Sequence, residues 1–459
     1  MKNNILASSY KDPSGFVFSQ NNKIFRQINK VYQNDYEQLM NSGLYKKLVS
    51  QKMLIPHREL PLTDTDPGVY KIIEPQQIPF ITYPCEWSFS QLKDAALLTL
   101  QIQKIAMQFN ISLKDASSFN IQFLHGKPIF IDTLSFEKYQ EGKPWVAYKQ
   151  FCEQFLAPLA LTCYTDIRLN KLLQDYLGSL PLDLVVKLLP LKAKINPGIF
   201  LHLFLHSRSQ KKYDKTIIKK QSSPAFSHQA FLGLVDSLEN LITNLRWKPI
   251  ASIWSSYAIN QPSYQKISLE KKKILIADYL DIIKPKTLWD IGANTGIFSR
   301  IASQKGIFTV SMDSDPSVVE QNYLQVKKNN DANILPLWID ILNPTPALGW
   351  DNQERNSLFE RPLPDMVMVL ALIHHLTIGN NLPLSKLAQF FAKIGKSLII
   401  EFVPKEDPQV QVLLQNREDI FPDYNQNSFE NEFAKYFNIK EKSILPNSKR
   451  ILYLMTRRN

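Results

Sequence analysis

The segment over 287–298, TLWDIGANTGIF, carries residues whose types and spacing could do chemistry. Asp290 ends an apolar run, and Gly292 and Gly296 follow it in the pattern D-x-G-x-x-x-G. The pattern predicts a buried strand, a tight turn and the start of a helix. Such a turn brings the backbone close to a ligand, because glycine has no Cβ and a helix N-terminus offers unpaired N–H donors.

Two classes of adenosine cofactor use a turn of this kind, the dinucleotides and S-adenosylmethionine. A dinucleotide turn prefers G-x-G-x-x-G around a pyrophosphate, whereas Ala293 and Asn294 occupy the middle of this turn. An acid at the strand end suits a cofactor that lacks phosphate and carries a cationic amino group. We therefore expect S-adenosylmethionine to bind at Asp290, Gly292, Ala293, Asn294 and Gly296.

Acidic residues also follow the next two apolar runs. Asp313 follows the run over 308–312, where a carboxylate can accept both ribose hydroxyls of an adenosine cofactor. Asp340 follows the run over 334–339 and is expected to meet the adenine edge. Each acid alone could be a solvated cap of a strand end, so the prediction depends on their common order.

Two adjacent histidines, His374 and His375, follow the apolar run over 366–373. Histidine titrates near neutral pH, so either ring could take the proton of a hydroxyl or amine acceptor. Neighbouring residues after a strand usually point apart, and we expect one of the two to act directly in catalysis. The alternative role is structural, with the rings hydrogen-bonding the turn and shaping the acceptor pocket.

Apolar runs and helical patterns alternate along the second half of the chain. This alternation predicts a parallel sheet with helices on both of its faces. Ligands of such sheets lie outside the carboxyl ends of the strands, where the acids and the histidines are expected. Beyond the runs already named, we expect strands over 397–402 and 450–455, the last one antiparallel, and helices over 269–283, 297–304, 316–329 and 383–394.

The order of these segments resembles that of the class I S-adenosylmethionine-dependent methyltransferases over residues 245–459. The resemblance implies a Rossmann-like α/β domain with a seven-stranded sheet, S-adenosylmethionine as the cofactor and methyl transfer as the reaction. The residues that match the family's motifs are Asp290, Gly292, Gly296, Asp313, Asp340 and the segment ALIHHL over 371–376, which borders the transferred methyl group.

The first half of the chain holds a second set of polar residues. Asp115 lies five residues before Asn120, Asp132 lies twelve residues after it, and apolar arms over 121–123 and 129–131 predict a hairpin between them. This segment resembles the catalytic segment of kinase-fold phosphotransferases. The resemblance implies an α+β kinase-like domain in which Asp115 is the base, and Asn120 and Asp132 are the magnesium ligands for Mg-ATP.

Other features of the first half depart from the kinase pattern. A single glycine stands in PSG over 13–15, where a glycine-rich phosphate loop is expected, and Arg26 stands where a strand lysine would reach the phosphates. Two alternatives therefore stay open, active phosphotransfer and a degenerate module that binds without transferring. In either case we expect strands over 16–18 and 23–26, a hinge strand over 78–83 and a helix over 88–109.

The whole chain is similar to one bacterial two-domain family, which includes nodulation-associated, NoeA-type methyltransferases. The segments that carry this resemblance are SGFVF, YPCEWSFSQLKDAALLTLQ, LKDASSFNIQF, IFIDTLSFE, ALIHHL and EFVPK. A chain of 459 residues is also too long for one ordinary core. We expect a kinase-like domain over 1–206, a linker and helix over 207–246, and a methyltransferase domain over 247–459.

Composition argues against several other classes of protein. The net charge is +12, but the lysines are spread along the sequence without the interleaved aromatics of an RNA-binding platform. Three cysteines without metal-ligand spacing fit a reducing cytoplasm. No apolar run is long enough to span a membrane, and no signal-peptide core is found. We expect a cytoplasmic protein.

Three functions remain open from the sequence. The first is methyl transfer to a small molecule or glycan that the first half of the chain recruits. The second adds ATP-dependent phosphotransfer in the first half, and the third is a non-catalytic module that binds a nucleotide or cofactor. Methylation of RNA or ribosomal protein is disfavoured, because ALIHHL over 371–376 replaces the N/D-P-P-Y/F signature that suits planar nitrogens. An oxygen acceptor is therefore favoured.

Overall fold

The computed structural model describes residues 4–21, 23–62, 67–209, 226–249, 263–415 and 418–458. The chain folds as two compact units. The first comprises Met1–Lys248 with Pro346–Ser357, and the second comprises Pro249–Thr345 with Leu358–Asn459. Much of the predicted linker, over 210–225, lies outside the described residues. Among the residues that are described, no helix combines the length and the apolar character that a membrane span requires.

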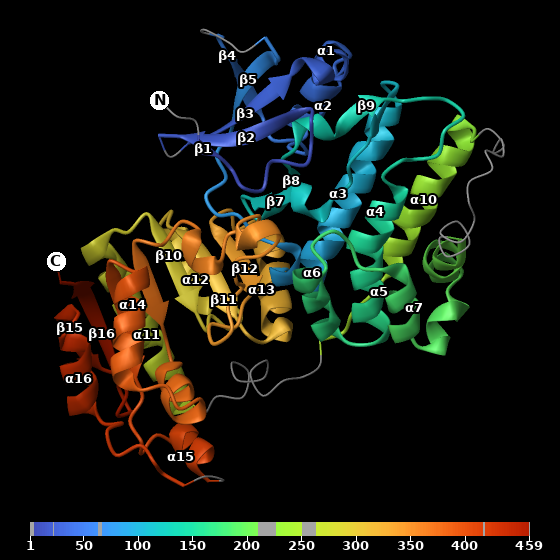
Figure 1. Ribbon diagram of the computed structural model, residues 1–459. Coiled ribbons are helices and arrows are strands. Elements are labelled where there is room, and N and C mark those ends of the chain that lie inside the picture. Colours follow the sequence, from blue (N-terminus) through green and yellow to red (C-terminus); the bar gives the residue numbers. More distant parts are fainter. Residues whose placement is uncertain are drawn as a thin grey trace. The chain divides into compact units, whose positions relative to one another are not determined.

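A seven-stranded sheet forms the centre of the second unit (Figure 1). Its strand order is β12-β11-β10-β13-β14-β16-β15, with the first five strands parallel and β16 antiparallel to both of its neighbours. The predicted parallel sheet with an antiparallel strand near the C-terminus is thus confirmed. The strands are β10 Thr287–Ile291, β11 Phe308–Asp313, β12 Ile334–Trp338, β13 Met366–Val369, β14 Ser397–Phe402, β15 Phe437–Ile444 and β16 Ile451–Arg457.

Helices cover both faces of this sheet, because its side chains alternate between two apolar faces. On one face, Leu288 and Met368 pack in one buried cluster with Ile276 of α11. On the other face, the Tyr453 ring lies 5.1 Å from the Phe429 ring of α16. The helices of this unit are α11 Ser263–Ile283, α12 Ile297–Gln304, α13 Pro316–Asn329, α14 Leu384–Ile394, α15 Pro408–Leu414 and α16 Gln426–Ala434, with a π-helix over His375–Gly379.

Two strands of the second unit differ from the prediction. The strand predicted over 366–373 ends at Val369, because Ala371 adopts a φ of +50°, which a strand residue does not. The family resemblance implies a seventh strand, but the segment that forms it, β15, was not predicted. Its sequence, FNIKEKSI, is mostly exposed and polar, so it lacks the alternation of apolar residues by which a half-buried strand is recognised.

The first unit contains a five-stranded antiparallel sheet of order β1-β2-β3-β5-β4 and two further antiparallel pairs, β6-β9 and β7-β8. The hairpins predicted around residues 16–26 and 121–131 are confirmed as β2-β3 and β7-β8. The strands are β1 Asn4–Ile5, β2 Gly15–Gln20, β3 Lys23–Asn29, β4 His57–Leu60, β5 Val69–Pro75, β6 Ile111–Leu113, β7 Ile121–Leu124, β8 Lys127–Phe130 and β9 Phe136–Lys138.

The helices of the first unit include one long buried helix, α3, against which α10 packs. α3 is capped by Ser88, the residue before its first turn, whose hydroxyl accepts a hydrogen bond from the backbone N–H of Gln91. The helices are α1 Gln33–Asn41, α2 Leu44–Ser50, α3 Phe89–Met107, α4 Tyr148–Phe151, α5 Ala157–Tyr164, α6 Leu172–Asp175, α7 Leu182–Leu188, α8 Pro197–Ile199 and α10 His228–Asn244, with π-helices over Cys152–Leu156 and Phe200–Leu205.

The predicted hinge strand over 78–83 is wrong, since this segment forms neither strand nor helix. Pro79 has no N–H to donate to a sheet. The amide of Thr82 donates instead to the side chain of Gln122, at 2.8 Å. The segment is therefore fixed by side-chain hydrogen bonds and not by strand pairing.

The first unit also includes the segment Pro346–Ser357, which the sequence order places between β12 and β13. Two backbone hydrogen bonds between Leu348 and Arg355, of 3.0 Å each, close it into a hairpin. The carboxylate of Glu354 accepts hydrogen bonds from Lys11 at 2.7 Å and from Tyr10 at 3.2 Å. These contacts attach the hairpin within the first unit.

Candidate active site

The turn between β10 and α12 has the conformation that its glycines permit. Gly292 and Gly296 adopt φ angles of 76° and 78°, in the left-handed region, and Asn294 adopts 51°. A Cβ on Gly296 would lie only 2.4 Å from Oδ1 of Asn322 in α13. Glycine is therefore needed at position 296 both for the backbone conformation and for the close approach of α13.

The N–H groups of this turn donate within the protein. Those of Gly292 and Ala293 both donate to the carbonyl of Met312 at 2.9 Å, and that of Asn294 donates to the carboxylate of Asp313 at 2.8 Å. The amides that can face a ligand therefore belong to the first turn of α12, where N–H groups have no partner within the helix.

Asp290 is buried beneath the turn, with 1% of its surface exposed. Its Oδ2 accepts a hydrogen bond from the Ser299 hydroxyl at 2.6 Å. The Ser299 hydroxyl also lies 3.1 Å from that of Ser311, which accepts a hydrogen bond from the Asn322 amide at 2.8 Å. Burial raises the pKa of Asp290 to about 7. Asp290 is therefore too buried for extensive contact with a ligand, and its carboxylate would act on the ligand mainly through its negative charge.

Asp313 and Asp340 lie at neighbouring strand ends. Burial raises the pKa of Asp313 to about 6, although its carboxylate is held by the amides of Asn294 and Asp315. The Ile339 amide donates to the Asp313 carbonyl at 3.0 Å, which places Asp340 beside Asp313. Because β10 pairs with β11 and β11 with β12, the three predicted acids come together at one edge of the sheet.

These features fit S-adenosylmethionine. Burial raises the pKa of the Asp290 and Asp313 carboxyls, so a negative charge on either one is poorly solvated. A ligand with a sulfonium and an ammonium group would supply the missing positive charge, whereas a pyrophosphate would add to the repulsion. The side chain of Leu372 lies against Gly292, since a Cβ added to Gly292 would lie 3.2 Å from it. This contact places the segment after β13 beside the cofactor turn.

The two predicted histidines follow Leu372, and they differ in burial. His374 is 1% exposed, and its Nδ1 has no hydrogen-bond partner among the described residues. His375 is partly exposed, and the two ring centres lie 4.1 Å apart. Burial lowers the pKa of both rings, and the nearby charge of Arg450 lowers it further. Both rings are therefore neutral at pH 7, and of the two only His375 is partly exposed to solvent.

A buried charge network behind the histidines was not predicted. The ammonium of Lys272 donates to the carboxylate of Glu401, whose other oxygen lies 3.5 Å from Arg450. Arg450 in turn makes two hydrogen bonds to Asp407, at 2.7 and 3.0 Å. Lys272 is the middle residue of a run of three lysines over 271–273, a composition typical of an exposed helix surface. Its place on the apolar stripe of α11, four residues before Ile276, is the signal that could have revealed its burial.

In the first unit, two of the predicted kinase-like residues are joined through Ser135. Its hydroxyl donates to Asp132 at 2.7 Å and accepts from the Asn120 amide at 3.1 Å. The guanidinium of Arg26 forms an ion pair with the same Asp132 carboxylate. Arg26 therefore lies against the carboxylate of the predicted magnesium ligand.

Asp115, the predicted base, is partly exposed, and two hydrogen bonds fix its carboxylate. Its Oδ1 accepts hydrogen bonds from the Ser117 amide at 2.9 Å and from the Gln150 side chain at 2.8 Å. Burial lowers the pKa of Arg26 to about 10, while the charge of Asp115 acts in the opposite direction. Over the described ranges, no group of three or more His, Cys, Asp or Glu side chains is arranged to hold a metal ion.

Comparison with known proteins assigns the chain to a family. Nodulation protein NoeA of Rhizobium meliloti (strain 1021) is 32% identical to it over 98% of this chain and 96% of that protein. The chain belongs to the NoeA family. No family model matches the sequence. Membership in the NoeA family, the strand order of the second unit and the acids at its strand ends together make the protein an S-adenosylmethionine-dependent methyltransferase.

Two of the solved structures that are similar to this NoeA-family chain each cover less than half of it. Magnesium protoporphyrin IX methyltransferase (ChlM) from Synechocystis PCC 6803, with bound SAM, is 13% identical over 44% of this chain and 88% of its own, with a TM-score of 0.32. The bifunctional kinase-methyltransferase WbdD is 15% identical over 47% of this chain and 45% of its own, with a TM-score of 0.31.

Proposed function

We propose that this protein transfers the methyl group of S-adenosylmethionine to an oxygen of a small molecule or glycan. The observation that carries the proposal is the position of His375. It is partly exposed, it has a lowered pKa, and it follows Leu372, whose side chain lies against Gly292 of the cofactor turn. A neutral imidazole at this place is suited to accept the proton of a hydroxyl group.

The chain's own residues would hold the cofactor and accept the proton. Asp313 and Asp340 would hold the ribose and adenine sides of the cofactor, and Asp290 would place negative charge near its methionine amino group. Bound S-adenosylmethionine supplies a methyl carbon activated by the positive sulfur. His375 would take the proton that the acceptor hydroxyl loses, and the buried ring of His374, 4.1 Å away, would keep His375 in place. Positioning and exclusion of water supply most of the acceleration in such a reaction.

The direct test is incubation with methyl-labelled S-adenosylmethionine and fractionated cell extract, followed by identification of the labelled product. We expect an O-methylated small molecule or glycan. His375→Ala should lower the rate of labelling by about 100-fold or more, the usual contribution of a general base. Asp290→Ala, and the more conservative Asp313→Asn, should abolish labelling through loss of cofactor binding. Equal labelling by wild type and both aspartate variants would overturn the proposed site.

We further propose that the first unit has a kinase-like fold but binds its ligand without phosphoryl transfer, and that it recruits the acceptor. The ion pair between Arg26 and Asp132 supports this proposal, because a guanidinium against the carboxylate competes with a magnesium ion. The alternative is a bifunctional enzyme with ATP-dependent phosphotransfer. Calorimetric titration with ATP and magnesium separates the two. Magnesium-dependent ATP binding that disappears in Asp132→Ala would favour the bifunctional enzyme, whereas its absence in wild type supports a non-transferring module.

A further inference from the structure

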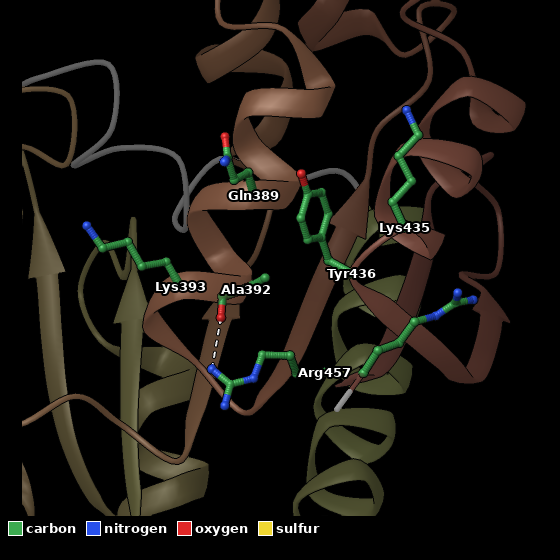
Figure 2. Close-up of a pocket in the computed structure, with 7 residues that line it drawn as sticks. Gln389, Ala392, Lys393, Lys435, Tyr436 and Arg457 are labelled. Carbon is green, nitrogen blue, oxygen red and sulfur yellow. Dashed lines mark hydrogen bonds between the residues drawn. The ribbon is translucent and has the colours of Figure 1, made fainter.

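The second unit has a hollow of about 370 Å³ that the proposed function does not use. This volume lies at the lower end of the range for small-ligand pockets. Figure 2 shows residues of α14 on one wall and residues around the start of β15 and the end of β16 on the other. The lining residues are Gln389, Ala392, Lys393, Lys435, Tyr436, Arg457 and Arg458.

This hollow and the cofactor site lie at opposite ends of the strands of the sheet. The acids and histidines follow the carboxyl ends of β10 to β13, whereas the hollow is built where α14 leads into the amino end of β14. Ser397, the first residue of β14, pairs with Thr456, next to Arg457 at the end of antiparallel β16. A ligand in the hollow is therefore separated from the cofactor by the length of the strands.

The lining of the hollow is strongly cationic. It contains two lysines and two arginines, and no acidic residue. Arg457 donates to the carbonyl of Ala392 at 3.1 Å, which fixes its guanidinium at the wall (Figure 2). Lys435 pairs with Glu432 on α16. Lys393 and Arg458 are exposed, and neither forms an ion pair within the described part of the chain.

We propose that this hollow binds a phosphate or diphosphate group. Lysine and arginine are the side chains that recognise such groups, through charge and through several N–H donors. The hydroxyl of Tyr436 and the amide of Gln389 add neutral donors from opposite walls. Cations that line one concave surface attract an anion more strongly than isolated ones do, because their fields add. The phosphate can belong to a free phosphorylated molecule or to a lipid headgroup.

The test uses the full-length protein and two probes, inorganic pyrophosphate and vesicles of phosphatidylcholine with or without phosphatidylglycerol. Pyrophosphate binding is measured by calorimetry at low salt, and vesicle binding by co-sedimentation. The variant Lys393→Glu/Arg458→Glu reverses both exposed charges of the hollow. Lys386→Glu is the matched control for the lysine, since it lies on the same helix seven residues earlier and does not line the hollow. Affinity for S-adenosylmethionine, measured in every variant, reports that the second unit is folded.

We expect pyrophosphate to bind wild type and Lys386→Glu alike, and the double variant roughly tenfold or more weakly, since four units of charge are lost. Binding should also weaken as salt is added. Binding to anionic vesicles alone, lost in the double variant, supports the proposal with a lipid as the source of the phosphate. Absence of binding to either probe, or equal binding by the double variant and wild type, overturns it.

Discussion

Lys272 of α11 and Glu401 of β14 form an ion pair inside the second unit, where 7% and 1% of their surfaces are exposed. The same ammonium lies 4.6 Å from the ring centre of Phe298, the second residue of the helix that follows the cofactor turn. One buried cation therefore connects the helix before the sheet, the last parallel strand and the cofactor turn.

Replacing one partner of this ion pair by an uncharged residue should lower the free energy of unfolding of the second unit. Lys272→Met leaves the Glu401 carboxylate buried beside Arg450 alone, and removal of one partner of a buried pair costs about 3–5 kcal/mol. Lys271→Met is the matched control, because Lys271 is exposed and its loss should change the free energy of unfolding by less than about 0.5 kcal/mol. Urea unfolding monitored by tryptophan fluorescence measures both. Equal midpoints would show that the pair does not stabilise the fold.

The affinity for S-adenosylmethionine should rise with pH because of Asp290. Burial raises its pKa to about 7, so the carboxylate is largely protonated at pH 6 and ionised at pH 8. A cationic ligand binds the ionised form more tightly. Calorimetric titrations from pH 6 to 8 should show this rise in wild type and a smaller one in Asp290→Asn, where only the ligand's own amino group titrates. Parallel pH profiles would contradict the prediction.

The same group should make the ligand-free protein less stable at high pH. A carboxyl whose pKa is higher in the folded state contributes stability below its unfolded pKa and loses it as the pH rises through the folded value. The difference between the ordinary 3.8 and about 7 corresponds to about 4 kcal/mol. Relative to Asp290→Asn, wild type should therefore lose free energy of unfolding between about pH 4 and 7, and change no further above that range.

The sequence predicted the second unit well because its signals are local. Asp290, Gly292 and Gly296 lie within seven residues, and each apolar run of the parallel sheet is buried on both faces and therefore nearly continuous. The parallel pairing of β10, β11 and β12 then places Asp313 and Asp340 beside the turn, because both follow the carboxyl ends of their strands. The burial of His374 was not predictable in this way. Two adjacent histidines are alike in the sequence, and which ring is buried depends on the path of the chain after β13 ends at Val369.

Contacts between distant segments account for most of what the sequence did not reveal. The pair of Lys272 and Glu401 spans 129 residues, and neither side chain differs in type from a solvated one. The attachment of Glu354 to Lys11 spans 343 residues. The hydrophobic periodicity of the sequence does not identify such a partner, because the hydrogen bond depends on the tertiary structure.

Replacement of Gly296 by alanine should cost more than the backbone conformation alone explains. Gly296 and Gly306 both adopt a φ of 78°, but a Cβ on Gly306 would meet no atom within 4 Å. Gly306→Ala should therefore lower the free energy of unfolding by about 1 kcal/mol, which is the strain of an L-residue in the left-handed region. Gly296→Ala should lower the free energy of unfolding by more than this, because the added Cβ would displace Asn322 and α13. It should also lower the affinity for S-adenosylmethionine. Chemical unfolding and calorimetry measure the two effects, and equal losses in both variants would refute the steric argument.

The carboxylate of Glu354 should control how firmly the hairpin over 346–357 is attached within the first unit. It accepts hydrogen bonds from Lys11, Tyr10 and the Trp350 amide, and removing it costs about 1–3 kcal/mol of hydrogen bonding. Since 1.4 kcal/mol is a factor of ten in an equilibrium, Glu354→Ala should raise the rate of limited proteolysis in the hairpin about tenfold. Gln353→Ala, at an exposed neighbouring position, should leave the rate unchanged. Cleavage at the wild-type rate in Glu354→Ala would mean that the hairpin is held by its other contacts, which include the guanidinium of Arg355 over the ring of Phe119 and the hydrogen bond from the Tyr83 hydroxyl to the Asn356 carbonyl.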